Sequence, residues 1–109
     1  MAMISKIKLL FAGILLLQLF GFALSTPVQA GNPIAGEQIY NTFCVNCHGM
    51  GGRNPIAGAP TFARGEGLMK PDMTLIQSIR MGRMAMPAFA GIISDREIHD
   101  VITYLRTLR

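Results

Sequence analysis

Cys44-Val45-Asn46-Cys47-His48 places two thiols three positions apart, with an imidazole directly after the second thiol. This spacing matches the haem-attachment signature, in which two sulfurs bond covalently to the porphyrin edge and the adjacent histidine binds the iron. Covalent bonds allow a small protein to hold haem without a large pocket. The motif therefore predicts one haem c, with Cys44 and Cys47 as attachment points and His48 as an iron ligand.

Two other kinds of site could use the same cysteines. A redox dithiol of the thioredoxin kind belongs to a strand–helix unit, and the sequence shows no strand pattern of period two. A zinc site needs a second pair of ligands, and His99 is the only further histidine or cysteine in the chain. A disulfide across so short a loop would stabilise the fold little. These comparisons favour haem.

The first 30 residues have the layout of a secretory signal. Lys6 and Lys8 form a basic start, residues 9–24 are apolar with few exceptions, and Val28 and Ala30 form the small-x-small pattern that signal peptidases cleave. We expect residues 1–30 to be a signal peptide that is removed. The alternative is a retained membrane anchor, for which an apolar stretch of about 16 residues is shorter than the ~20 that span a bilayer.

Removal of residues 1–30 from the 109-residue chain leaves 79 residues, with eight basic and six acidic side chains and a net charge of about +2. A charge this small predicts no nucleic-acid partner and no anionic membrane surface. A membrane association is expected only if the N-terminal segment is retained. A domain of this size buries little core and usually needs a bound group to stabilise it.

The remaining sequence predicts an all-α domain of three main helices and long loops. Asn32 and Pro33 begin a helix over 33–43, and a second helix begins near Asp72 and ends at Gly82. Ser94 and Glu97 form a capping box at the start of the last helix. Its apolar stripe comprises Ile98, Val101, Ile102, Leu105 and Leu108. His99 lies away from this stripe, so we expect it to be solvated.

From about residue 33 to residue 108 the sequence resembles the class I bacterial mono-haem cytochromes c. The resemblance rests on Gly36, Tyr40, the Cys44–His48 signature with Gly49, the segment Met86-Pro87-Ala88-Phe89, and Tyr104-Leu105 in the final helix. It implies that residues 31–109 form a cytochrome c domain of the small cytochrome c fold, wrapped around one covalently bound haem.

The resemblance also implies the second iron ligand. The family places its ligand methionine just ahead of a proline, and Met86 precedes Pro87 in an irregular segment. A thioether ligand favours ferrous iron. We therefore expect His48 and Met86 to be the axial ligands, with Met84, two residues earlier, as the alternative.

Pro60 and Tyr104 are the other residues that the resemblance places around the cofactor. In this family a proline carbonyl after the signature accepts a hydrogen bond from the ligating histidine, and Pro60 looks like that proline, although Pro55 lies in the same loop. Gly36 and Tyr104 look like the crossing point of the first and last helices, which is a structural role.

The sequence thus predicts a periplasmic electron carrier that exchanges single electrons with redox partner proteins and is not an enzyme. Four arginines, Arg53, Arg64, Arg80 and Arg83, could surround the methionine side of the haem and steer such partners. One alternative is a haem-based ligand-binding sensor or weak peroxidase, which would need an open sixth position. Another is a subunit or anchored partner of a larger respiratory or dehydrogenase complex.

Overall fold

The computed structural model describes residues 1, 3–9, 11, 29–53 and 55–108. Within the domain part of this range the elements are the helices α2 (Pro33–Phe43), α3 (Val45–His48), α4 (Asp72–Met81) and α5 (Asp95–Leu105), and the 3₁₀ turns η2 (Met50–Gly52) and η3 (Phe62–Arg64). The described residues form no strand, only an isolated bridge between Arg83 and Met86. The predicted all-α class is confirmed.

The three main helices lie where the sequence predicts them, because each begins or ends at a local signal. The Asn32 side chain accepts hydrogen bonds from the backbone N–H groups of Ile34 and Ala35 at 3.0 and 3.2 Å, which caps α2. Gly82 ends α4, and Ser94 and Glu97 form both bonds of the capping box at α5. The sequence prediction omitted α3, which continues the chain in helical form through the haem-attachment motif.

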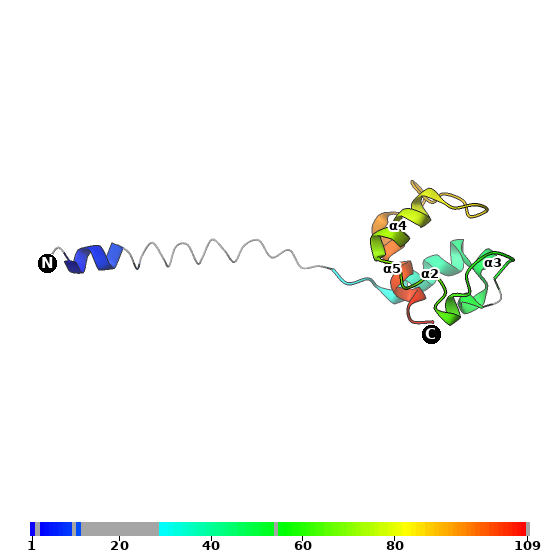
Figure 1. Cartoon of the computed structure of the whole chain (residues 1–109), viewed down its shortest axis with the longest axis horizontal. Helices are drawn as coiled ribbons and strands as arrows, with labels where there is room; N and C mark the ends of the chain where they lie inside the picture. The colour runs from blue at the N-terminus through cyan, green and yellow to red at the C-terminus, as the bar shows by residue number, and fades with distance from the viewer. Residues whose placement is uncertain (2, 10, 12–28, 54, 109) are drawn as a thin grey trace.

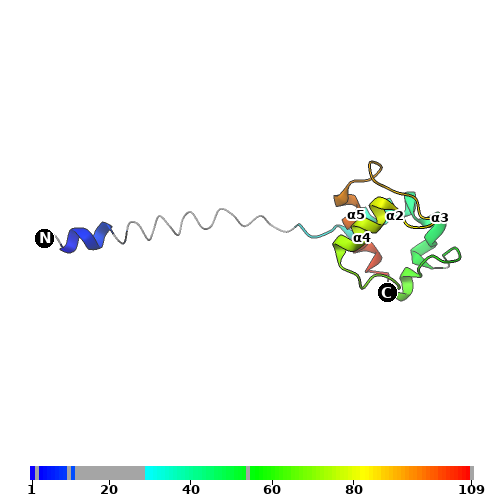
Figure 2. The ribbon, with the colours of Figure 1, turned by 45° about the horizontal axis from the view of Figure 1, so that its top comes forward.

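The helices α2 and α5 cross at Gly36. In Figures 1 and 2 the two helices lie side by side, and α4 packs against α5. A Cβ atom at Gly36 would overlap the backbone carbonyl of Asp100 and would lie 2.9 Å from the backbone nitrogen of Val101. Only a residue without a side chain allows this approach, so the predicted role of Gly36 at the helix crossing is confirmed.

The buried apolar residues form two groups, and α5 contributes to both. The first core cluster comprises Tyr40, Leu68, Val101, Tyr104 and Leu105. The second core cluster comprises Ile76, Phe89, Ile93, Ile98 and Ile102. Ile39 of α2 is partly buried against both clusters. The C-terminal helix therefore joins the two halves of the core.

Two polar residues of α5 are at least partly buried, and His99 was expected to be solvated. Asp100 is only 6 % exposed, because its carboxylate accepts a hydrogen bond from the backbone N–H of Asn32 at 2.8 Å and pairs with Arg96 at 3.3 Å. His99 is half-buried rather than fully solvated, and its Nε2 lies 3.3 Å from a carboxylate oxygen of Asp72. Both side chains join α5 to the beginning of another helix.

Most of the expected signal peptide, residues 2, 10 and 12–28, lies outside the described residues, so the structure gives no account of its cleavage. Among the helices that are described, none has the length and apolar character needed to cross a membrane.

We predict that Gly36→Ala lowers the free energy of unfolding by about 1–3 kcal/mol, because the added methyl group must push α2 away from α5. Guanidinium unfolding of the haem-loaded protein measures this change. Gly58→Ala is the control: no heavy atom lies within 4 Å of its added Cβ, and its φ of 85° alone costs about 1 kcal/mol. Equal losses in the two variants would contradict close packing at Gly36.

Candidate haem-binding site

The two thiols of the motif lie at the junction of α2 and α3. Cys44 caps α3 and is half-buried, Cys47 is exposed on α3, and both are free. The backbone N–H groups of Cys47 and His48 both donate to the carbonyl of Cys44, at 3.2 and 2.9 Å. One helical turn therefore holds both sulfur-bearing residues and the imidazole together.

Burial raises the pKa of the Cys44 thiol to about 11, and the neighbouring Cys47 raises it further in the same direction. A thiol with this pKa is almost entirely protonated at neutral pH. Catalytic dithiols and metal-binding cysteines act as thiolates, and their surroundings lower the thiol pKa. The environment of Cys44 therefore disfavours a redox dithiol.

His48 is half-buried behind this junction. Burial lowers the pKa of its imidazole, which favours the neutral form that can bind iron. Its ring stacks on Phe62, with ring centroids 4.7 Å apart and an interplanar angle of 26°. Its Nδ1 atom is buried and has no hydrogen-bond partner among the residues that the structure describes.

The expected hydrogen bond between His48 and the carbonyl of Pro60 is therefore not formed in this structure. Pro60 is half-buried in the loop between η2 and η3. The unpaired Nδ1 of His48 leaves a donor position for such a bond. The bond to Pro60, and its alternative at Pro55, remain predictions for the haem-loaded protein.

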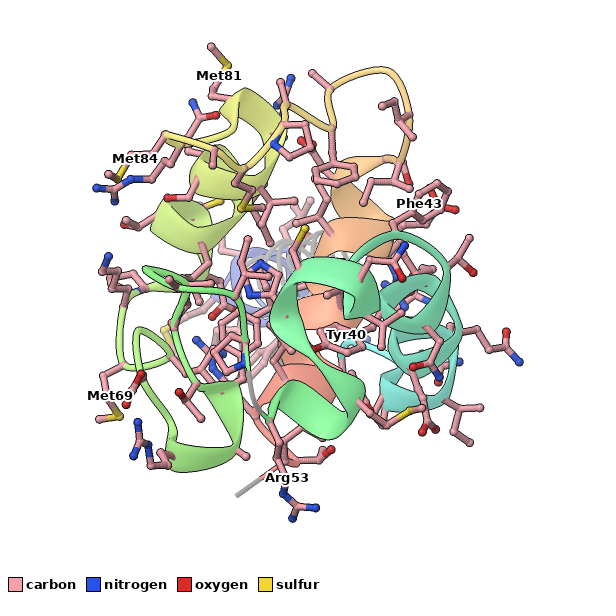
Figure 3. All side chains as sticks on the ribbon, turned by 90° about the vertical axis from the view of Figure 1, so that its right-hand side faces the viewer. Tyr40, Phe43, Arg53, Met69, Met81 and Met84 are labelled. Atoms are coloured by element: carbon pink, nitrogen blue, oxygen red, sulfur yellow. The ribbon has the colours of Figure 1, made fainter. Side chains whose placement is uncertain are left out.

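Tyr40 of α2 holds the backbone directly after His48. Its side chain is fully buried, and its hydroxyl donates a hydrogen bond to the carbonyl of Gly49 at 2.7 Å. Burial raises the pKa of this hydroxyl to about 12, so it stays protonated and able to donate. Figure 3 shows Tyr40 in the interior of the domain. Tyr40 lies on the helix predicted over residues 33–43, but no sequence pattern indicates this hydrogen bond.

Tyr104 of α5 packs beside Tyr40, with ring centroids 5.4 Å apart and an interplanar angle of 55°. It lies one helical turn beyond the crossing of α5 with Gly36, and only 8 % of it is exposed. These contacts support its structural role in the first core cluster. A contact between Tyr104 and the cofactor remains a prediction.

The two candidate methionine ligands point in different directions. Arg83 and Met86 exchange backbone hydrogen bonds at 3.1 and 2.9 Å, which makes a tight turn with Met84 and Ala85 at its tip. Met84 has a φ of 52° and is fully exposed, and Figure 3 shows it at the edge of the domain. Met86 is half-buried and packs against the second core cluster.

The segment after Met86 is tied to the end of α4. The backbone N–H groups of Phe89 and Ala90 donate to the carbonyls of Ile79 and Arg80 at 3.2 and 3.1 Å. A Cβ atom at Gly82 would lie 2.6 Å from the carbonyl oxygen of Met86, so glycine is needed for this close approach. The methionine loop is thus held in position from both of its ends.

The residues fit a covalently bound haem. Two free thiols and a neutral imidazole lie on one helical turn, and the imidazole carries a buried nitrogen without a partner. On the second core cluster, a half-buried methionine is held by a tied loop. Ile39 of α2 packs against both core clusters, of which the first contacts Cys44 and the second contacts Met86.

Comparisons with known proteins show which family the chain is similar to. Residues 31–105 match the family described as cytochrome c oxidase, cbb3-type, subunit III. Cytochrome c6 of Nostoc sp. is 34 % identical over 103 residues, covering 90 % of this chain and 91 % of the relative. Cytochrome c6 of Gloeothece citriformis is 35 % identical over 102 residues, covering 90 % of this chain and 91 % of the relative.

A solved structure is similar over the domain. The crystal structure of cytochrome c6 from the diatom Phaeodactylum tricornutum has a TM-score of 0.58 and 38 % sequence identity. The match covers 71 % of this chain and 93 % of the diatom protein. The domain therefore shares its fold with this cytochrome c6.

We predict that Tyr40→Phe lowers the free energy of unfolding by about 1–3 kcal/mol, because the half-buried carbonyl of Gly49 loses its hydrogen bond. Denaturant unfolding of the haem-loaded protein provides the measurement. Tyr104→Phe is the matched control, since no hydrogen bond of its hydroxyl is found among the described residues, and its effect should stay within about 0.5 kcal/mol. A Tyr40→Phe variant as stable as the control would show that this bond contributes nothing.

Proposed function

Since the chain belongs to the class I mono-haem c-type cytochromes, we propose that it carries single electrons between exported redox proteins through a haem held by Cys44, Cys47, His48 and Met86. Electron transfer through one covalently bound haem c follows from the family. The assignment of these four residues, and of the compartment, belongs to the proposal.

The cysteines and the histidine have separate roles in this proposal. The sulfurs of Cys44 and Cys47 form the covalent bonds to the porphyrin, and the imidazole of His48 binds the iron. When bound, the haem iron supplies the redox chemistry, taking one electron from a donor protein and giving one electron to an acceptor protein. Tyr40 holds the carbonyl of Gly49 and so keeps the backbone after His48 in place.

The different orientations of Met84 and Met86 are the observation that favours an electron-transfer function over a ligand-binding sensor. Met86 turns toward the second core cluster, while Met84 turns to solvent. A methionine held inward by a tied loop can occupy the sixth position permanently. With both axial positions filled by the protein, no ligand enters or leaves when the iron changes charge, and the reorganisation stays small.

The compartment follows from the same chemistry. Covalent attachment of haem c in bacteria takes place outside the cytoplasm, and residues 1–30 have the layout of an export signal. We therefore place the working protein in the periplasm, with residues 31–109 as the domain that remains after cleavage.

The family description also names a subunit of a cytochrome c oxidase. An N-terminal segment found intact in the purified protein would favour such an anchored version.

Two of the four arginines that the sequence suggested as a docking rim are neutralised by neighbours. Arg64 pairs with Glu66 at 2.9 Å, and Arg80 pairs with Asp95 at 3.1 Å. Arg53 and Arg83 are exposed, and among the described residues neither forms an ion pair. Arg83 adjoins the turn that carries Met84. The proposal therefore assigns the steering of acidic redox partners mainly to Arg53 and Arg83.

We predict that the haem-loaded protein shows a low-spin visible spectrum that carbon monoxide does not change. Met86→Ala should open the sixth position, so that carbon monoxide shifts the spectrum of the reduced variant. Met84→Ala, the matched control, should behave like the original protein. The measurement is an absorption spectrum of each reduced protein with and without the gas.

A carbon monoxide shift in the unaltered protein would overturn the electron-carrier proposal in favour of a sensor or peroxidase. A shift in Met84→Ala but not in Met86→Ala would instead move the ligand to Met84.

We predict that Arg53→Gln and Arg83→Gln each slow the oxidation of the reduced protein by the anion ferricyanide roughly threefold at low salt, and that added salt removes the difference. Stopped-flow absorbance measures the rate. Arg64→Gln and Arg80→Gln change the net charge equally and are the controls, with smaller expected effects because their charges are already paired. Equal effects in all four variants would show that net charge alone matters.

A further inference from the structure

The ring of Phe62 lies face to face with the ring of His48, at 4.7 Å between centroids and 26° between planes. Phe62 is half-buried and packs against the first core cluster. A flat ring at this distance restricts rotation of the imidazole about its bond to Cβ, because most other orientations would collide with the ring face. The stack is therefore a mechanical constraint on the plane of His48.

Phe62 can act as a constraint because its own turn is held firmly. Phe62 begins η3, which closes with a hydrogen bond from the backbone N–H of Gly65 to the carbonyl of Phe62 at 2.7 Å. The carboxylate of Glu66 accepts from the backbone N–H of Thr61 at 2.8 Å and pairs with Arg64 at 2.9 Å. These contacts pin the turn on both sides of Phe62.

The loop after His48 supports Phe62 from behind. Gly52 is buried and has a φ of 68°, and a Cβ atom there would lie 2.7 Å from Cβ of Phe62 and 3.0 Å from the side chain of Leu108. Glycine at this position lets the backbone at the end of η2 lie directly against Phe62. The segment that directly follows α3, which carries His48, thus supports the residue that the His48 ring contacts.

No hydrogen bond fixes the plane of the imidazole in the described part of this structure, and the bond to Pro60 or Pro55 is a prediction for the haem-loaded protein only. Nδ1 of His48 has no hydrogen-bond partner there. Tyr40 holds the following carbonyl, of Gly49, and so fixes the backbone but not the rotation of the side chain. We propose that Phe62 is a positioning residue that sets the plane of the His48 imidazole for iron binding.

This inference rests on the proposed function, in which His48 is an axial ligand. An axial imidazole donates π electrons into the iron d orbital that its plane selects, so its orientation affects the g values of low-spin ferric iron. Electron paramagnetic resonance therefore responds to a change in the orientation of the ring. Loss of packing alone would lower stability without moving these g values, provided that the ring plane stayed the same.

The experiment compares Phe62→Ala, Phe62→Leu and Phe62→Tyr in the haem-loaded ferric protein. We expect Phe62→Ala to shift the g values and to broaden the resonance lines, because the ring of His48 gains rotational freedom. Phe62→Leu keeps most of the side-chain volume but loses the flat aromatic face, so it should also shift the g values. It replaces Phe62→Ala in the experiment if the alanine variant does not incorporate haem. Phe62→Tyr keeps the flat aromatic face and should retain the g values of the original protein.

Phe43→Leu is the matched control. Phe43 lies next to Cys44, and its ring contacts the edge of Phe89 at 6.3 Å between centroids rather than His48. It should leave the g values unchanged. Original g values in Phe62→Leu and Phe62→Ala would overturn the inference and assign the ring plane to another constraint, such as a carbonyl hydrogen bond. A high-spin spectrum in the unaltered protein would instead contradict the proposed function.

Discussion

The close crossing of α2 and α5 is the constraint on which the rest of the domain depends. Because Gly36 has no side chain, the backbone of α2 lies directly against the backbone of α5 at Asp100 and Val101. The carboxylate of Asp100 extends this contact by accepting a hydrogen bond from the N–H of Asn32, the capping residue of α2. Since α2 leads into the haem-attachment motif, the crossing places Cys44 and His48 relative to the core. The helix α5 also contributes Ile98 and Ile102 to the second core cluster, against which Met86 packs.

Local signals in the sequence were sufficient to predict the main helices. Asn32 with Pro33, Gly82, and Ser94 with Glu97 each act within a few residues of the helix end that they define. The candidate ligands Cys44, Cys47 and His48 were equally easy to propose from the sequence, because they lie within one five-residue motif. The choice of Met86 came from its position before Pro87 and from family resemblance, and the inward packing of Met86 now supports it.

The sequence did not predict contacts between segments that lie far apart along the chain. Asp100 lies outside the apolar stripe of α5, yet it is buried because its carboxylate accepts a hydrogen bond from the backbone N–H of Asn32 at the beginning of α2. No sequence pattern singled out Phe62, because its stacking on His48 depends on the 3₁₀ turn that contains it and on the close approach of Gly52. Met84 and Met86 differ by only two positions, and the tight turn between Arg83 and Met86 gives them opposite orientations.

The contribution of α5 to both core clusters has a consequence for the order of events during export. A chain that is threaded through a membrane with its N-terminus first delivers residues 44–48 well before residues 95–105. Until α5 arrives, neither cluster has its central helix, and the chain that has already emerged has no complete core to collapse around. If the chain is exported as proposed, Cys44, which the folded domain half-buries, is not yet enclosed by a completed core at that stage. The placement of the central helix last in the sequence thus leaves the attachment residues outside a complete core until α5 has been delivered.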